Sequence, residues 1–297
     1  MAPPCLTPAT GLRYASDMRE LKNKVVVITG GASGIGRALA DRFAAEGSKI
    51  VLADIEAKAL EEAAAELRAG GATVLAVPTD VSKPEQVQAL CDRTLAEFGR
   101  VDVVCNNAGV AVSGPTWEHS LEDWQWVLGV NLWGVIHGVR TFVPVLLRQG
   151  GEGHIVNTGS VAGLASGPLM SVYNVTKHGV VTLSETLQKD LALLGSTIKV
   201  SVLCPGFVRT RILDADRNRP ASLRTSATPQ HDPEMEGRAR AAIAAGLPPA
   251  EAAAQVVDAV KNERFYVLTH SEFAPWIQER MEDILEGRNP SPALVLA

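Results

Sequence analysis

The sequence has few cysteines and no strongly charged block. Its 297 residues include four scattered cysteines, Cys5, Cys91, Cys105 and Cys204, which form no CxxC pair. This spacing argues against a disulfide scaffold and a zinc site, so we expect no metal and a reducing, cytoplasmic location. With 28 Lys and Arg against 33 Asp and Glu, the net charge is −5. A mildly acidic chain without a basic block is a poor candidate for binding nucleic acid or an anionic membrane.

Long hydrophobic runs are missing as well. No uninterrupted apolar run reaches the ~20 residues that span a bilayer, so we expect no membrane segment. The first 22 residues lack a basic start, and charged side chains interrupt their apolar positions, so we expect no signal peptide. With 46% hydrophobic and 21% charged residues, the chain has the composition of a folded protein with a sizeable core.

Short β-branched segments alternate with segments of helical periodicity over most of the chain. The predicted strands are Val25–Thr29, Lys49–Ala53, Thr73–Val77, Asp102–Asn106, His154–Asn157, Ile198–Leu203 and Phe265–Leu268. Helical spacing separates them, as in Ile35–Glu46 and Val87–Phe98. Because strands that alternate with helices form a parallel sheet covered on both faces, we predict one α/β domain with a doubly wound parallel sheet of about seven strands.

The expected domain boundaries follow from where this periodicity stops. Length alone, at ~150 residues per domain, would allow two domains, but no linker or repeat divides residues 23–270. Residues 1–22, with three prolines, are expected to form a flexible arm, and residues 271–297 a C-terminal tail. The irregular stretch within residues 207–246 is interpreted as a functional lid. Pro144 should kink or end the helix that contains it.

A glycine-rich loop, Gly30–Gly36, joins the first predicted strand to a helix. Glycines let the chain turn sharply and let backbone N–H groups approach a pyrophosphate at the positive end of the helix. Glycines also mark ordinary turns, but the strand before and the helix after favour a dinucleotide site. The loop residues expected to contact the nucleotide are Gly30, Ser33, Gly34, Ile35 and Gly36.

Asp54 ends the second predicted strand, 18 residues after Gly36. A carboxylate there can accept hydrogen bonds from the ribose hydroxyls of adenosine, and it would repel a 2′-phosphate. Neither Ser33 nor Ile55, its expected neighbours, carries a compensating positive charge. The sequence therefore favours NAD over NADP, unless Asp54 is simply an exposed acid at a strand end.

Asp80 and Val81 follow the third predicted strand at the same edge of the sheet. At this place they could contact the adenine ring. The alternative is that Asp80 only starts the helix that enters at Lys83 and Pro84.

Tyr173 and Lys177 lie four residues apart in a helical segment. This spacing places the phenol and the ammonium on one helix face, about one turn apart. A phenol ionises near pH ~10, and a neighbouring ammonium lowers that pKa, so the pair could transfer protons at neutral pH. Tyrosine and lysine are common on amphipathic helices, so the pair alone would be weak evidence.

Further polar residues gather near the pair. Ser160 lies thirteen residues upstream, just past the fifth predicted strand. Asn106–Gly109 and Pro205–Thr210 follow the fourth and sixth strands, at the carboxyl edge where α/β sheets bind ligands. Asn131 lies inside an apolar helix, where a polar side chain needs a specific partner.

These motifs together resemble the short-chain dehydrogenase/reductase family, in its compact single-domain branch with a Rossmann fold. The resemblance extends from about Lys24 to Thr269, and every principal motif occurs in order. Thr29–Gly36 is similar to the cofactor loop of the family, and Asn106–Gly109 to its sheet-stabilising motif. Asn131, Ser160, Tyr173 and Lys177 match its catalytic tetrad.

The resemblance implies a role for each member of the tetrad. Tyr173 would act as general acid–base toward the alcohol or carbonyl oxygen, and Ser160 would hydrogen-bond that oxygen. Lys177 would lower the pKa of the tyrosine and bind the nicotinamide ribose. Asn131 would position a water that links Lys177 to solvent. The nicotinamide cofactor, NAD rather than NADP, supplies the hydride.

The resemblance also places further residues at the cofactor. Asn107 would lie near the ribose, unless it only forms a turn, and Val208 and Thr210 would hold the carboxamide and phosphates. The remaining expected cofactor contacts are Ala108, Gly109, Pro205 and Gly206. The residues after Tyr173, which are bulkier than is common in the family, put the pocket shape in doubt and leave the reaction unaffected.

The expected pocket is mostly apolar. Leu164, Met170, Phe207 and Trp117 are its candidate lining residues, although each could equally belong to the core. We therefore expect a bulky, apolar secondary alcohol or its ketone as the small-molecule substrate. Arginines of the lid could instead accept a carboxylate or an acyl carrier, but nearby acids weaken that alternative.

The family usually assembles into homotetramers or homodimers through the helices that carry Asn131 and Tyr173, and the apolar stretches there are consistent with such assembly. Two other functions stay open at this point. One is an NAD(H)-binding regulator or scaffold, although such proteins usually lose the tyrosine or the lysine. The other is an epimerase or dehydratase on the same fold, although those usually carry a separate C-terminal substrate domain.

Overall fold

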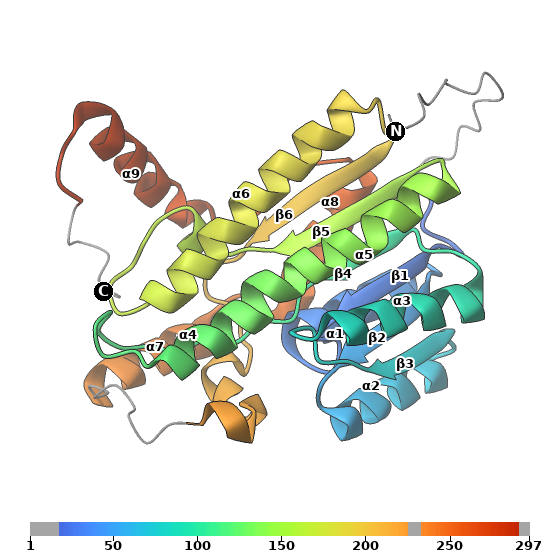
Figure 1. The fold of residues 1–297 in the computed structure, drawn as a ribbon, viewed down its shortest axis with the longest axis horizontal. Coiled ribbons are helices and arrows are strands. Elements are labelled where there is room, and N and C mark those ends of the chain that lie inside the picture. Colours follow the sequence, from blue (N-terminus) through green and yellow to red (C-terminus); the bar gives the residue numbers. More distant parts are fainter. Residues whose placement is uncertain (1–17, 225–232, 291–297) are drawn as a thin grey trace, which may run out of the picture.

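The computed structural model describes residues 18–224 and 233–290. Its centre is a seven-stranded parallel sheet in the order β3-β2-β1-β4-β5-β6-β7 (Figure 1). The strands are β1 Val25–Thr29, β2 Lys49–Asp54, β3 Val74–Pro78, β4 Val103–Asn106, β5 Gly153–Thr158, β6 Ile198–Cys204 and β7 Tyr266–Leu268. The predicted α/β class and doubly wound parallel sheet are confirmed, with strand ends that differ from the predicted ones by one residue at most.

Helices cover both faces of this sheet (Figure 1). They are α1 Gly34–Ala45, α2 Ala57–Ala69, α3 Pro84–Phe98, α4 Leu121–Leu128, α5 Gly134–Gln149, α6 Ser171–Leu193, α7 Pro233–Ala245, α8 Pro249–Lys261 and α9 Ala274–Glu286. Alternate residues of β1 face opposite layers, so Val26 and Ile28 pack toward α1, α2 and α8. Val25 and Val27 pack toward α3, α5 and α6. Burial on both faces is why the strands read as unbroken apolar runs.

The strand order reverses between β1 and its neighbour β4. From β1 the chain runs outward through β2 and β3, and it then returns to place β4 on the other side of β1. Loops at the carboxyl ends of β1 and β4 therefore leave the sheet in opposite directions and open a crevice between them. The glycine loop after β1 and the Asn106–Gly109 segment after β4 both enter this crevice.

Two expectations about chain ends need correction. Met18 and Leu21, which we assigned to the flexible arm, are buried against α1 and α2, and Ser48 Oγ donates to Leu21 O over 2.8 Å. Residues 1–17 of that arm lie outside the described residues. The tail expected over 271–297 contains α9, and its residues 291–297 are also outside the described part.

The lid region is less irregular than its sequence indicates. It contains the short 3₁₀ helices η3 (Ile212–Asn218) and η4 (Ala221–Leu223) and the longer α7. Residues 225–232 of this region lie outside the described residues. Because glycine, proline and charged residues interrupt the apolar spacing, the periodicity did not reveal these helices.

Of the two predicted effects of Pro144, the ending of its helix is wrong, and a kink stays a prediction. Pro144 lies inside α5, which continues to Gln149. Proline removes the hydrogen bond to the carbonyl four residues earlier, that of Arg140. Both Pro144 and Arg140 are exposed, so water can replace the lost donor on this outer face.

One helical stretch among the described residues, Leu121–Gln149, is long and apolar enough to cross a membrane by length and composition. It combines α4, a π-helical turn η1 (Gly129–Trp133) and α5, and its mean hydropathy is 1.4. The sequence shows no uninterrupted apolar run of this length, because charged and polar residues divide the stretch. Half of its apolar window is buried inside the domain, where Phe142 and Leu146 pack on the sheet. Core packing therefore accounts for the buried half of this apolar window.

Candidate active site

The glycine loop forms a tight cradle at the start of α1. Gly30 and Gly34 adopt left-handed φ angles of 65° and 56°, which favour glycine. A Cβ atom on Gly36 would lie 2.0 Å from Gly30 O, so only glycine lets the helix pack this closely. Ser33 caps α1 without a side-chain hydrogen bond, which leaves the first backbone N–H groups available. Such a helix start fits a diphosphate.

Asp54 lies at the carboxyl end of β2 with only 9% of its surface exposed. Its Oδ2 accepts from Ala32 N and its Oδ1 from Glu56 N, each over 3.0 Å. Burial raises the pKa of Asp54, although the two backbone donors act in the opposite direction. The carboxylate is thus held in one orientation, and each oxygen keeps a lone pair that can accept from a ribose hydroxyl.

Asp80 is tied to its own turn. Its Oδ1 accepts from Ser82 N over 2.9 Å and from Ser82 Oγ over 2.7 Å, and its backbone N–H donates to Gln86 Oε1 over 2.7 Å. Val81 is buried beside Gly134 of α5. These contacts hold the turn ahead of α3, whose N-cap is Lys83, and both Asp80 and Val81 line the cavity beside Asp54, so their contact with adenine stays a prediction.

The asparagines after β4 connect neighbouring strands. Asn106 Nδ2 donates to Asn157 Oδ1 of β5 over 2.9 Å. Asn107 Nδ2 donates to Thr29 O of β1 over 3.0 Å, and Thr158 Oγ1 donates to Asn107 Oδ1 over 3.4 Å. These contacts hold the carboxyl ends of β1, β4 and β5 together, so the crevice keeps a fixed shape.

Asn131 lies in the π-helical turn η1 and is fully buried. Its Oδ1 accepts from Val110 N over 2.8 Å, while its Nδ2 donates to Val110 O over 2.9 Å and to Thr176 Oγ1 over 3.3 Å. Since these contacts occupy the side-chain amide, it fastens the loop after β4 to α6. The predicted water at Asn131 could therefore bind only to its side-chain oxygen or to its backbone, because both hydrogens of Nδ2 are donated.

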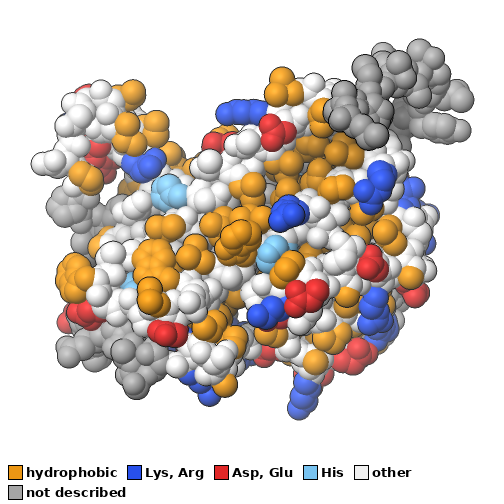
Figure 2. Space-filling view, viewed as in Figure 1, with side chains coloured by type: hydrophobic (Ala, Val, Ile, Leu, Met, Phe, Trp, Pro, Cys, Tyr) orange, Lys and Arg blue, Asp and Glu red, His pale blue; other side chains and the backbone are white. Residues whose placement is uncertain are grey.

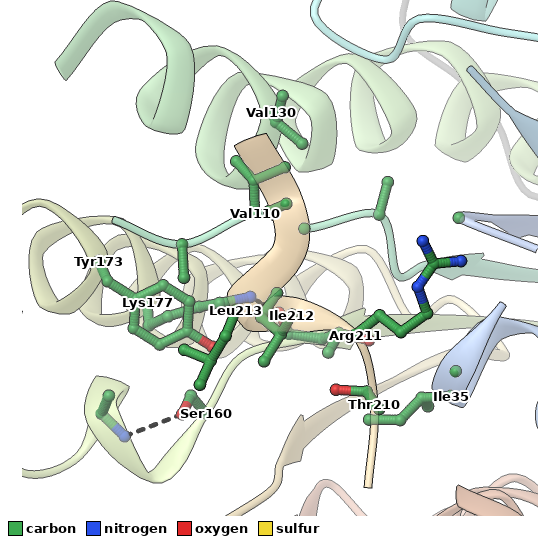
Figure 3. Close-up of a pocket in the computed structure, with 18 of the residues that line it drawn as sticks. Ile35, Val110, Val130, Ser160, Tyr173, Lys177, Thr210, Arg211, Ile212 and Leu213 are labelled. Carbon is green, nitrogen blue, oxygen red and sulfur yellow. Dashed lines mark hydrogen bonds between the residues drawn. The ribbon is translucent and has the colours of Figure 1, made fainter. Parts of the chain in front are cut away.

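The other three tetrad residues face one another (Figure 3). Tyr173 and Lys177 both project from α6, and Lys177 Nζ lies 5.4 Å from the centroid of the Tyr173 ring. Lys177 Nζ also donates to Thr158 O over 2.8 Å. Ser160 Oγ accepts from Ala162 N over 3.1 Å, donates to Pro205 O over 3.3 Å and hydrogen-bonds to the Tyr173 side chain. The arrangement brings two hydroxyl groups to one point beside an ammonium.

Burial dominates the protonation of this pair. It raises the pKa of Tyr173 to about 12, although the hydrogen bond with Ser160 acts in the opposite direction. It also lowers the pKa of Lys177 to about 8. We predicted that Lys177 lowers the pKa of Tyr173. In the structure, burial has the larger effect and raises that pKa. The reason is that both groups lie away from water, which disfavours the charged form of each.

One cavity of about 830 Å³ joins the nucleotide cradle to these catalytic groups. All predicted site residues line this cavity except Gly36 and Asn131. Gly36 packs beneath the glycine loop, against Gly30, and Asn131 is bonded to the backbone of Val110. Met170 and Phe207 line it as expected. Leu164 instead packs against Val181 and Val202, and Trp117 is 85% exposed, so neither of these two belongs to the pocket.

Several lining residues were missed from the sequence. They include Ile212 and Leu213 of η3, Met235, Ala239 and Ile243 of α7, and Phe273 and Trp276 at the start of α9. Met235, Ala239 and Ile243 are spaced four residues apart, and this spacing could have predicted that they share one helix face. Nothing in the sequence indicated that Phe273 and Trp276 return to the site, because they follow the last strand.

Comparisons with known proteins agree with this geometry. The short chain dehydrogenase family matches residues 24–221. The chain is 34% identical to a CLA biosynthesis dehydrogenase/reductase of Lactiplantibacillus plantarum, over 92% of this chain and 97% of that relative. It is 36% identical to the 1-deoxy-11-beta-hydroxypentalenate dehydrogenase of Streptomyces exfoliatus, over 89% of each.

A solved structure gives the same result. A short chain dehydrogenase/reductase from Burkholderia phymatum in complex with NAD superposes with a TM-score of 0.91. It is 47% identical in sequence and covers 93% of this chain and 99% of its own. The motifs, the fold and these matches agree, and this chain belongs to the short-chain dehydrogenase/reductase family.

Proposed function

We propose that this protein is an NAD-dependent oxidoreductase that interconverts a bulky, apolar secondary alcohol and its ketone. The observation that carries the proposal is the single cavity in which Asp54 and the glycine cradle lie at one end and Ser160, Tyr173 and Lys177 at the other. Bound NAD would supply the hydride acceptor. The glycine cradle would hold its diphosphate and Asp54 its adenosine ribose.

The catalytic side chains have the chemistry that alcohol oxidation needs. Ser160 and Tyr173 would both hydrogen-bond the substrate oxygen and hold the reacting carbon in place. Tyr173 would take the hydroxyl proton during oxidation and return it during ketone reduction. Lys177 Nζ lies 5.4 Å from the centroid of the Tyr173 ring, so it would exchange that proton with the tyrosine through a bridging water.

We expect opposite pH dependences for the two directions. The Tyr173–Lys177 pair should lose its first proton near pH 8, because burial lowers the pKa of Lys177 to about 8. Oxidation needs the pair able to accept a proton, so kcat/KM for an alcohol should rise through that pH. Ketone reduction needs the proton present, so its kcat/KM should fall there. Initial rates between pH 6 and 10 test this, and two flat profiles would contradict it.

Asp54→Ala should narrow the preference for NAD over NADP by at least about tenfold, since it removes both the ribose acceptor and the charge that repels a 2′-phosphate. The measurement is the ratio of kcat/KM for the two cofactors. Asp92→Ala, an exposed acid on α3, is the matched control. An unchanged ratio in Asp54→Ala would show that this carboxylate does not discriminate between them.

The substrate class rests on the walls of the cavity. Beyond Ser160, these walls are mainly apolar side chains such as Met170, Leu213, Phe207 and Trp276. Arg238 of α7 also lines the cavity, but it pairs with Glu234 over 2.8 Å, which weakens the alternative of a carboxylate substrate. The relative named as a 1-deoxy-11-beta-hydroxypentalenate dehydrogenase supports oxidation of a hydroxyl group, and because its name is that of a carboxylate, the carboxylate alternative stays open.

A substrate panel tests the proposal as a whole. Purified protein with NAD is offered linear, alicyclic and aromatic secondary alcohols, and NADH formation is followed by its absorbance. We expect turnover that increases with apolar bulk and is lost with primary short-chain alcohols. NADH binding without any turnover would favour the regulator or scaffold alternative instead.

We also propose that the protein assembles as a homodimer or homotetramer through α4, α5 and α6 and acts in the cytoplasm. Hydrophobic side chains gather over these helices in Figure 2. Trp133 of η1 and Val175 of α6 are 49% and 50% exposed, so they offer apolar surface on this face for a second copy of the chain to cover. Sedimentation velocity should give a dimer or tetramer, whereas a monomer at micromolar concentration would contradict this assembly.

A further inference from the structure

Glu56 connects the nucleotide end of the cavity to the lid. It follows Asp54 by two residues, and its Oε1 accepts from Arg217 Nε over 3.0 Å and from Asn218 Nδ2 over 2.9 Å. Arg217 Nη2 lies 2.9 Å from the same oxygen. Burial acts to raise the pKa of Glu56, but the hydrogen bonds from Asn218 and Arg217 and the charges of Arg217 and Arg211 hold that pKa below its usual value. Glu56 is therefore an anion that engages a lid arginine.

Arg217 is fixed in this position from its own side as well. Its Nη1 donates to Asp214 O over 2.8 Å and to Arg211 O over 3.2 Å. The Arg217 side chain is 25% exposed. Arg217 lines the same cavity as Asp54, Ile55 and Glu56. The positive charge of Arg217 therefore lies at the end of the cavity where Asp54 is, and the Glu56 carboxylate pairs with it there.

This geometry bears on the discrimination between NAD and NADP, and the argument rests on the proposed NAD-dependent function. The two cofactors differ only in a 2′-phosphate on the adenosine ribose. A nearby arginine normally accommodates that phosphate, and here the guanidinium of Arg217 already pairs with a carboxylate.

We propose that Glu56 is a second specificity-determining residue, which excludes NADP by keeping the Arg217 guanidinium engaged. Asp54 then acts by repelling the 2′-phosphate directly, and Glu56 acts by withholding the cation that could receive it. The two effects are physically distinct because only the second depends on Arg217.

Other cations near this end need their own control. Arg211 and Lys83 line the cavity, and Arg211 contributes to the low pKa of Glu56. Figure 3 shows Arg211 on the same side of the cavity as Ile35. Arg211 forms no ion pair with any residue in the described ranges, so its charge is present whether or not Glu56 is replaced. Replacing Glu56 also removes the attraction between its charge and that of Arg211, so the Arg217→Gln background is needed to measure what Arg211 contributes on its own.

The test is a double-mutant cycle with Glu56→Gln, Arg217→Gln and the double variant. Dissociation constants are measured for NADH and NADPH, and for adenosine 5′-monophosphate and adenosine 2′,5′-bisphosphate. The two adenosine nucleotides lack the nicotinamide and differ from each other only in the 2′-phosphate, so comparing them measures the effect of that phosphate alone. The matched control is the Glu61–Arg68 ion pair of α2, which lies outside the cavity and joins its two side chains over 2.6 Å.

We expect Glu56→Gln to improve 2′-phosphate binding, measured as the ratio of the two constants in each pair, by roughly tenfold. In the Arg217→Gln background, Glu56→Gln should change the ratio of the two dissociation constants by about twofold or less. The control variant Glu61→Gln should leave that ratio unchanged. An equal gain in both backgrounds would show direct repulsion by Glu56 and overturn the proposal. Equal weakening of both ligands, from a loosened lid, would also overturn it, because the ratio would not move.

Failure of this inference and failure of the proposed function give different results. If NADH binds and supports turnover but the Glu56→Gln ratio is unchanged, only the role of Glu56 is wrong. If neither reduced cofactor binds to the unaltered protein, the proposed function itself fails.

Discussion

Tyr173→Phe should lower kcat by about a thousandfold or more while the dissociation constant for NADH stays within about twofold. The substitution removes only the hydroxyl that would exchange a proton with the substrate, and general acid–base groups contribute roughly 10²–10⁴-fold. The ring over which Lys177 lies remains, so the amine should keep its contact with Thr158. The measurements are steady-state rates and a fluorescence titration with NADH.

Tyr266→Phe is the matched control for this experiment. Tyr266 lies in β7, is 45% exposed and donates its hydroxyl to Glu185 over 2.6 Å, outside the cavity. It should keep normal rates. If Tyr173→Phe also kept near-normal rates, Tyr173 would not be the acid–base group, and another hydroxyl such as Ser160 would have to carry the proton.

Gly36→Ala should raise the dissociation constant for NADH by about 100-fold and lower thermal stability. The added Cβ would lie 2.0 Å from Gly30 O and 2.6 Å from Asn107 Nδ2, so backbone must move. Overpacking of this kind costs about 1–3 kcal/mol. The displaced atoms belong to the loop expected to hold the diphosphate and to the asparagine that ties β1 to β4. The measurements are an NADH titration and a thermal melt.

Two further variants separate local from general effects of an added methyl group. Gly237→Ala places its Cβ in open space on α7 and should leave NADH binding unchanged. Gly34→Ala is milder than Gly36→Ala, because its Cβ meets only Thr210 Cγ2 at 3.2 Å, although its positive φ still disfavours alanine. Normal NADH binding in Gly36→Ala would mean that this loop does not contact the cofactor.

Much of the fold was predictable because the strands are buried on both faces. Each strand stands out as a β-branched run, and even the short β7 was recognisable within one residue. Whether Pro144 would end its helix was not predictable, because that depends on whether the helix face is exposed, which no local pattern records. Met18 and Leu21 were misjudged because their burial depends on a groove made by α1 and α2, which lie later in the chain.

The site was predictable where polar side chains lie at or just after the carboxyl end of a strand. Asp54, Asn107 and Ser160 all follow strands at the carboxyl edge, and the structure brings them to one cavity. The roles of Trp276 and Arg217 were not predictable, because lid and C-terminal segments return to the site by tertiary packing. The pKa of Tyr173 was also beyond reach, since it depends on burial rather than on the spacing to Lys177.

The most direct test of NAD-dependent function is a titration of the purified protein with NADH and with NADPH. Trp126 and Trp276 line the cavity, so energy transfer from tryptophan to the reduced nicotinamide reports binding there. We predict saturable NADH binding in the micromolar range or tighter, and NADPH binding at least about tenfold weaker. Tighter binding of NADPH would contradict the roles given to Asp54 and Glu56. Binding of neither nucleotide would contradict the proposed function altogether.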